Sequence, residues 1–482
     1  MFDFRPILFV VGLLLCGLAV AMILPAIVDA AVGHPDWQVF FSAAAVTLFV
    51  GVSLVLVTRG ANRTIGVRQA FMLTTVAWIT VAAFAALPFA FAALDLSYAD
   101  AFYEAMSGIT TTGGTVIVGL DAAPPGILLW RALLQWLGGI GIIVLAVAVL
   151  PVLRVGGMQV FRTEGRDTTE KVLPRAALIA ASVWAIYVAL TFACTVAYWA
   201  GGMGGFDAVT HAMTTVATGG FSTSDASLGK FSTPFIDGTA IVFMISGSLP
   251  FPLYIQALRG RPTALWRDRQ VQTFAAALAL LIVVTGLLLW QHSDYSLPAA
   301  LRHAALNITS IVTTTGYTTH PYDTWGAFAA TIFFVAIFIG GCTGSTTGGL
   351  KIFRFQVLYA AATTQLWRML HPHGVFLPYF NRRPVGDDVI TSVMSFFFLY
   401  ILAFAALAAG LATLGLDFVT AVSSAASAIA NVGPGIGPVV GPAGTFAPLP
   451  DAAKWLLSAG MLLGRLELFT VMILLAPSFW RH

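Results

Sequence analysis

Charged residues are scarce in this chain. Only 9% of its 482 residues are Asp, Glu, Lys or Arg, whereas 58% are hydrophobic, and the mean hydropathy is +0.88. Soluble domains carry about 25% charged residues, so the composition excludes an ordinary water-soluble protein. It predicts an integral membrane protein that contacts the lipid bilayer. The net charge of +3 is too small to indicate a nucleic-acid partner.

Cysteine and catalytic patterns are also sparse. Cys16, Cys194 and Cys342 are odd in number, lie in apolar or glycine-rich surroundings and form no CxxC motif. They are therefore expected to be packed thiols, not a disulfide framework or a metal site. No Ser/His pair, HExxH motif or paired aspartates occur within the apolar runs. We expect neither an enzyme nor a covalently bound cofactor.

Long apolar runs are what the chain has instead. A bilayer-spanning helix needs about 20 apolar residues. The first run is longer than the apolar core of a signal peptide, which is about 7–15 residues, so a retained helix is expected. Ten such runs occur, the eighth of them interrupted: 7–28, 39–57, 69–94, 127–153, 175–200, 235–258, 271–291, 325–360, 389–414 and 452–476.

Four short segments between these runs end alike. They finish at Gly113, Gly219, Gly316 and Gly433, which recur about every hundred residues. Each follows a stretch of about a dozen residues that is too short to cross the bilayer. Such stretches are typical of re-entrant pore helices, expected at Ala99–Ile109, Phe206–Thr215, Pro298–Ile311 and Asp417–Ile429.

This repetition predicts the fold. We expect an all-α integral membrane protein of about ten transmembrane helices, with four pseudo-symmetric helix–pore loop–helix repeats around one central pore. The predicted divisions are an N-terminal helix pair (1–60) and repeats at 61–165, 166–262, 263–375 and 376–482. A secondary transporter with inverted repeats is the rival class. Parallel two-span modules whose loops enter from one side favour the channel-like pore.

Backbone carbonyls of four such loops can replace the water shell of a cation. Glycine is needed there because turning the carbonyls inward requires backbone angles that other residues adopt at a cost. Helix packing through small residues would explain one such loop, but not four at matching positions. The candidate ion-binding residues are Thr111, Thr112, Gly113, Ala217, Thr218, Gly219, Thr314, Thr315, Gly316, Asn431, Val432 and Gly433.

The distribution of charge predicts orientation. With the N-terminus inside, 19 of the 24 Lys and Arg residues face inward, and only Arg131, Lys230, Arg302 and Lys454 face outward. By the positive-inside rule, both termini are cytoplasmic and the loops enter from outside. Acidic residues cluster on the outer side. They could cap helices or form a negative vestibule that concentrates cations, and the two roles are compatible.

A glycine-rich segment interrupts the eighth run. Five glycines in ten residues cannot sustain a helix, and no Walker A motif is present. The segment is either a passive kink or a mobile gate beneath the filter. Arg465 lies inside the last run, where a charge costs roughly 2.5–3.5 kcal/mol and should face the pore or a partner. The candidate gate residues are Gly340, Gly341, Cys342, Thr343, Gly344, Ser345, Thr346, Thr347, Gly348, Gly349 and Arg465.

Taken together, the four loops resemble those of the TrkH/TrkG potassium-uptake proteins, which share a superfamily with KtrB and the plant HKT transporters. The resemblance covers the whole chain and implies K⁺ as the transported substrate, the bacterial cytoplasmic (inner) membrane, a homodimer, and a cytosolic TrkA-like ring that alone would bind nucleotides. The basic segments Arg154–Arg175 and Arg354–Arg383 are candidate docking sites. In the plant relatives a serine in the first loop accompanies Na⁺ preference, so Gly113 favours K⁺. Na⁺ permeation and coupling to H⁺ or Na⁺ remain alternatives.

Overall fold

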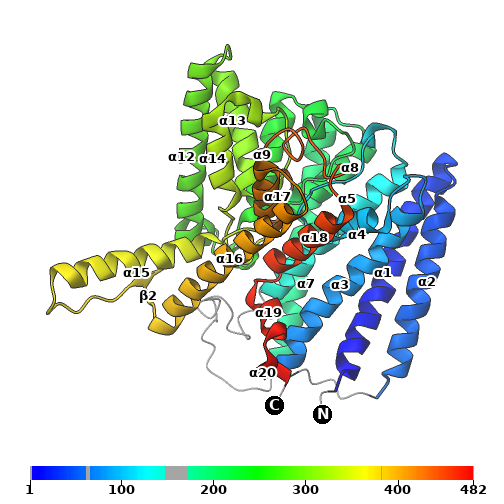
Figure 1. The fold of residues 1–482 in the computed structure, drawn as a ribbon, viewed down its shortest axis with the longest axis horizontal. Coiled ribbons are helices and arrows are strands. Elements are labelled where there is room, and N and C mark those ends of the chain that lie inside the picture. Colours follow the sequence, from blue (N-terminus) through cyan, green and yellow to red (C-terminus); the bar gives the residue numbers. More distant parts are fainter. Residues whose placement is uncertain (1–2, 61–65, 147–171, 382, 481–482) are drawn as a thin grey trace.

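The computed structural model describes residues 3–60, 66–146, 172–381 and 383–480, and the regular secondary structure in this part of the chain is helical apart from one short hairpin (Figure 1). Seven described helices are long and apolar enough to cross a bilayer, and two bent helix pairs bring the number of spans to nine. The shorter apolar helix Ala327–Ile337 adds the interrupted span. The expectation of about ten membrane helices is confirmed.

The first two helices, α1 (Arg5–Val32) and α2 (Trp37–Val57), form a pair at one edge of the molecule (Figure 1). They cross where two glycines meet, since a Cβ on Gly12 would lie 2.8 Å from the carbonyl oxygen of Gly51. Small residues at such a crossing let membrane helices approach closely. The buried carboxylate of Asp29 accepts a 2.6 Å hydrogen bond from the amide of Gly126 and ties the pair to the first repeat.

The remaining chain repeats one pattern of outer helix, short helix and inner helix four times. The expected pore helices are confirmed to within one residue at each end. The outer helices are α3 (Val67–Phe91), α7 (Val172–Ala200), α12 (Arg269–His292) and α16 (Asp387–Thr413). The short helices are α4 (Tyr98–Ile109), α8 (Gly205–Val216), α13 (Leu297–Val312) and α17 (Phe418–Ala430). The inner helices are α5 (Pro125–Val144), α9 (Pro234–Ser248), α14 (Ala327–Ile337) and α18 (Asp451–Arg465).

Inner helices of the second and fourth repeats are broken, so the continuous spans expected at 235–258 and 452–476 are wrong. Helix α9 bends by 93° into α10 (Phe251–Leu258). Pro250 lacks an amide hydrogen and pushes Leu249 into an extended conformation. Helix α18 bends by 108° toward α19 (Phe469–Met472). Glu467 at that break has a left-handed backbone, with φ of 59°.

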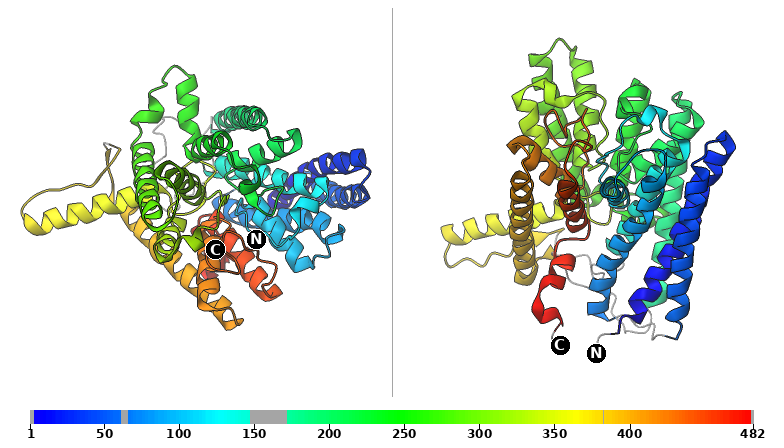
Figure 2. Two further views of the ribbon diagram at one scale, coloured as in Figure 1. Left: turned by 90° about the horizontal axis from the view of Figure 1, so that it is seen from above. Right: turned by 45° about the vertical axis from the view of Figure 1, so that its right-hand side comes forward.

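The inner helix of the third repeat continues beyond its glycine-rich loop as α15 (Ile352–Leu370), which projects away from the bundle with a small hairpin of β1 (Tyr379–Phe380) and β2 (Arg383–Pro384) (Figures 1 and 2). This projecting arm carries exposed apolar side chains, including Tyr359 and Met369. The other short elements are η1 (Leu120–Ala122), η4 (Ser227–Phe231), α11 (Ala264–Arg267), η5 (Tyr322–Trp325), η6 (Ile473–Leu475) and α20 (Pro477–Trp480).

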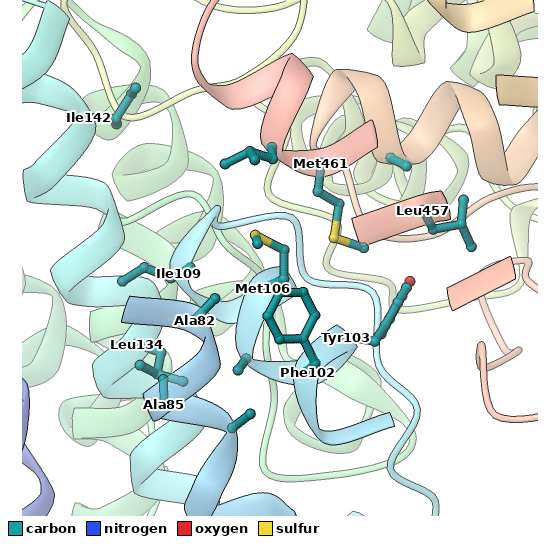
Figure 3. Packing of buried hydrophobic residues seen from close by; sticks show 14 of the residues in the cluster. Ala82, Ala85, Phe102, Tyr103, Met106, Ile109, Leu134, Ile142, Leu457 and Met461 are labelled. Carbon is teal, nitrogen blue, oxygen red and sulfur yellow. The ribbon is translucent and has the colours of Figure 1, made fainter. Parts of the chain in front are cut away.

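Packing between the first and fourth repeats closes the bundle. Met106 of α4 and Met461 of α18 belong to one buried cluster and lie near each other (Figure 3). Phe102 of α4 also stacks at 4.6 Å between ring centroids on Trp455 of α18. Because α18 is the last inner helix and α4 the first short one, these contacts join the two ends of the repeat series.

Candidate ion pathway

Hydrogen bonds at the end of each short helix show that the four loops share one conformation. In each, an amide bonds to the carbonyl three residues earlier, and the next amide bonds to the carbonyl five residues earlier. The first set joins Thr111 to Gly108, Thr218 to Thr215, Thr314 to Ile311 and Asn431 to Ala428. The second set joins Thr112 to Ser107, Gly219 to Thr214, Thr315 to Ser310 and Val432 to Ser427.

The backbone angles give the same register and correct one predicted match. Thr111 and its three equivalents all have φ between 51° and 55°. Two residues later comes a glycine with positive φ, and in the second loop this is Gly220, not Gly219. The sequence matched Gly219 to Gly113 because two glycines stand side by side. Gly219 instead corresponds to Thr112, so the four equivalent glycines are Gly113, Gly220, Gly316 and Gly433.

These glycines form a closed cycle around one axis. A Cβ on Gly113 would overlap the carbonyl oxygen of Gly219 in the second loop. Each of the other glycines is packed in the same way against a carbonyl of the following repeat, and the fourth returns to the first. The remaining contacts are Gly220 with Thr315, Gly316 with Val432 and Gly433 with Thr112. The carbonyl oxygens of residues 112, 219, 315 and 432 therefore lie at the four contacts between adjacent loops of the ring.

A cavity of about 330 Å³ opens on one side of this ring, the side that the charge distribution predicts to face outward. All four equivalent glycines line it, as do Arg131 and Asp225. The four cations assigned to the outer side each pair with a carboxylate. The pairs are Arg131–Glu104 at 2.7 Å, Lys230–Asp121 at 2.7 Å, Arg302–Asp237 at 3.6 Å and Lys454–Asp100 at 2.5 Å.

Each of those four cations is therefore compensated by a carboxylate. The hydrogen bond from Lys230 holds the pKa of Asp121 below its usual value, so this exposed pair stays ionised near neutral pH. Asp225 holds the two amides of Gly119 and Leu120 at 3.1 Å each. Among the described residues that line the cavity, Asp225 is the one carboxylate, and Arg131, the one cation there, is paired with Glu104.

The glycine-rich loop between α14 and α15 lies directly beneath the ring and is almost entirely buried. The hydroxyl of Thr218 donates to that of Thr346 at 3.0 Å, and the amide of Gly348 donates to the hydroxyl of Thr314 at 2.7 Å. The last carbonyls of α9, which a helix end leaves unpaired, accept loop amides: Gly247 from Thr346 and Ser248 from Cys342. These bonds attach the loop to the second and third ring loops and to one broken inner helix, and Gly348 also packs against Ala430 at the start of the fourth ring loop.

Two buried cations hold the loop from below. Arg465 donates through Nη1 to the carbonyl of Thr346 at 2.9 Å, whereas its Nε and Nη2 have no hydrogen-bond partner among the described residues. Lys351 donates to the carbonyl of Thr347 and, at 2.9 Å, to its hydroxyl. A small cavity of about 20 Å³ lies between the loop, Lys351 and Arg465. These contacts attach the two side chains to successive carbonyls of the loop.

Sequence reasoning missed Lys351 and misplaced Arg354. Both were counted among the inward-facing cations, yet both are buried. Arg354 forms an ion pair with Glu467 and lies 3.7 Å from the ring centroid of Phe396. A lysine and an arginine next to an apolar run were the available signal, because charges at membrane depth are costly and usually functional. The basic segment Arg154–Arg175 lies almost wholly outside the described residues.

The fold and this site define a polytopic membrane protein in which four re-entrant loops of one chain surround a single axis. The chain belongs to the TrkH family of cation transport proteins, which matches residues 36–482. It is 47% identical over 480 residues to the Trk system potassium uptake protein TrkI of Halomonas elongata, covering 99% of this chain and 97% of that one. It is 38% identical over 485 residues to the Trk system potassium uptake protein TrkH of Escherichia coli, covering both fully.

Solved structures agree with these relationships. The crystal structure of the potassium transporter TrkH from Vibrio parahaemolyticus matches with a TM-score of 0.92 and 38% identity over the full length of both chains. The predicted family and fold class are therefore confirmed.

The ring contacts predict which glycines tolerate a side chain least. Gly220→Ala places a Cβ against the Thr315 carbonyl at positive φ, whereas at Gly433 the nearest carbonyl is 2.7 Å away. We expect Gly220→Ala to lower the free energy of unfolding by roughly 1–3 kcal/mol and Gly433→Ala by less, measured by thermal unfolding in detergent. Gly205→Ala is the control, because its Cβ meets no atom within 4 Å. Equal melting temperatures for Gly220→Ala and Gly205→Ala would contradict the register.

Proposed function

We propose that this protein takes up K⁺ across the bacterial cytoplasmic membrane through a channel-like pathway, with the ring of loops as its selectivity filter. The observation that carries the proposal is the closed cycle in which each repeat's glycine packs against a carbonyl of the next. Carbonyls held in this way can replace the hydration shell of a cation. The names of the relatives support potassium as the ion.

The short helices add to the attraction. Each runs into its loop at its C-terminal end, where the aligned peptide dipoles carry a partial negative charge of about half an elementary charge. Four such ends converge on the ring from one chain. They stabilise a cation there without a carboxylate side chain, so the ion is not held too tightly to leave.

Replacing the first glycine tests the filter. Gly113→Ser introduces a side chain that overlaps the Gly219 carbonyl, so the ring must shift. We expect permeation to move toward Na⁺ while the protein still folds. The measurement is ion flux in proteoliposomes with K⁺, Rb⁺, Na⁺ and Li⁺ in turn, with and without a pH gradient. Gly205→Ser serves as the control. An unchanged K⁺/Na⁺ ratio in Gly113→Ser would reject the loop as the selective site.

The glycine-rich loop, Gly340 to Gly349, is proposed as the gate. It lies under the ring, and a parallel bridge between Ile339 and Leu350 joins the two residues that flank it. Arg465 and Lys351 support this role, since they place positive charge below the ring and hold carbonyls of the same loop. A cation leaving the ring would meet both charges. Displacement of the loop would therefore change both the steric and the electrostatic barrier.

Removing one of these charges should open the pathway. Arg465→Ala eliminates a buried charge and the bond to Thr346. Two like unit charges 4 Å apart repel each other by about 1 kcal/mol even in water. Removing this repulsion between Arg465 and a passing cation should raise basal Rb⁺ uptake, into vesicles without any regulator, about fivefold or more. Arg259→Ala, at an exposed residue, is the control. If flux in Arg465→Ala falls or stays level at matched protein amount, the gate is refuted and the segment is a structural kink.

A homodimer and a TrkA-like nucleotide-binding ring are the proposed partners, with both termini on the cytosolic side. The exposed apolar face of the projecting arm, including Leu366, Trp367 and Leu370, supports contact with another protein surface. The Trk system names of the relatives support a multicomponent assembly. Arg354 no longer fits a docking role, because it is buried against Glu467.

Arg368 and Arg383, which are exposed on the arm, remain as docking candidates. We expect the double variant Arg368→Ala/Arg383→Ala to reduce copurification of the ring, since it removes two accessible charges. The native mass of the purified assembly would report the dimer in the same experiment. Gln272→Ala, at an exposed residue of α12, controls for general surface effects. Full ring binding by the double variant would exclude docking through these arginines.

A further inference from the structure

One inner-helix side chain makes two hydrogen bonds to the second loop of the ring. Gln135 of α5 is fully buried. Its Nε2 donates to the carbonyl of Gly219 at 2.6 Å, and its Oε1 accepts the amide of Phe221 at 3.0 Å. The carboxamide therefore spans Gly220, the equivalent glycine of this repeat, and fixes the loop on both sides of it.

The same carboxamide explains why residue 219 is glycine. The equivalent positions are Thr112, Thr315 and Val432, so this place in the loop accepts a side chain elsewhere. Gly219 does not have a positive φ, whereas Gly220 does. A Cβ on Gly219 would overlap Cδ of Gln135. Gln135 thus occupies, from a neighbouring helix, the space that a side chain fills in the other three loops.

This arrangement makes the four ring carbonyls unequal. Within the described parts of the chain, the carbonyls of Thr112, Thr315 and Val432 accept no hydrogen bond. The Gly219 carbonyl accepts one from Gln135. A donor on a carbonyl oxygen competes with an ion for its lone pairs and holds the oxygen in place. The second repeat therefore offers the ion a weaker, more rigid ligand than its three equivalents do.

We propose that Gln135 is a positioning residue that sets ion selectivity, by bonding one ring carbonyl and keeping the field of the ring low enough to disfavour small cations. The inference rests on the proposed filter. Ions with high charge density gain most from strong ligands, so releasing the Gly219 carbonyl should favour Na⁺ and Li⁺ over K⁺. It should not favour Cs⁺, which is larger than K⁺ and gains least.

Gln135→Met tests the electrostatic part with a side chain of similar length. The net free energy of one hydrogen bond corresponds to roughly a three- to tenfold change in an equilibrium constant. We expect the Na⁺/K⁺ permeability ratio in proteoliposomes to rise by about that factor, with Cs⁺/K⁺ level or lower. Gln270→Met is the matched control, because Gln270 is also buried but bonds the amide of Thr343 in the glycine-rich loop. An unchanged Na⁺/K⁺ ratio would overturn the proposal. So would a joint rise of Na⁺ and Cs⁺, which indicates a loosened loop.

A second pair of variants tests the occupied space independently. Gly219→Thr restores the residue type of loops one and three but collides with Gln135, so we expect K⁺ flux to be lost. Gln135→Ala in the same chain removes the obstacle, and flux should return at matched protein amount. Failure of this rescue would overturn the steric part. Gly113→Ser, measured in parallel, distinguishes failure of the proposed filter from failure of the proposed role of Gln135. If it alters selectivity and Gln135→Met does not, the filter stands and only the role of Gln135 falls.

Discussion

A backbone carbonyl without a hydrogen-bond partner is costly inside a membrane, and three of the four ring carbonyls, those of Thr112, Thr315 and Val432, accept no hydrogen bond within the described residues. The short helices end halfway through the bundle, and the loops that follow cannot continue the helical bonding. Positive φ at Thr111 and Gly113, and at their equivalents, turns the chain sharply within three residues. The carbonyls are then left to face one another or an ion. Contacts between adjacent repeats hold the loops in this unfavourable arrangement.

Because each glycine packs against a carbonyl of the next repeat, no loop is positioned alone. The use of one chain for all four repeats allows them to differ while the cycle is kept. Gly219 leaves space for Gln135. In the fourth loop Asn431 takes the left-handed position, which asparagine tolerates better than most residues. Its Nδ2 contacts the hydroxyl of Thr112 and the carbonyl of Met461, each at 2.9 Å. That side chain binds the last repeat to the first.

The sequence allowed the architecture to be predicted because membrane spans are long apolar runs and the four glycine-ended segments recur at a regular spacing. The four pore helices followed from their short length and the recurring glycines that end them, and the interrupted third-repeat span followed from its five glycines. What failed depended on single-residue geometry. A Gly-Gly pair fits two registers, and only the backbone angles separate Gly219 from Gly220. The bend at Leu249 could have been suspected from Pro250. The bend at Glu467 could not, because no proline or glycine stands at that position, and the ion-pair partner of Glu467, Arg354, lies 113 residues away in the chain.

The cations on the two sides of the ring have different partners: carboxylates on one side and, for Arg465 and Lys351, backbone carbonyls on the other. On the side of the large cavity, Arg131, Lys454 and Arg302 each pair with a carboxylate. Within each pair the two charges neutralise each other. Beneath the ring, Arg465 and Lys351 bond carbonyls of the glycine-rich loop, and Glu467, whose carboxylate lines the same small cavity, is paired with Arg354. The loop carbonyls therefore supply hydrogen bonds that stabilise these two buried cations, Arg465 and Lys351, and the bonds require the loop in this position. If the loop is the proposed gate, its displacement would leave both cations to water, so the position of the loop and the hydration of the pathway would be linked.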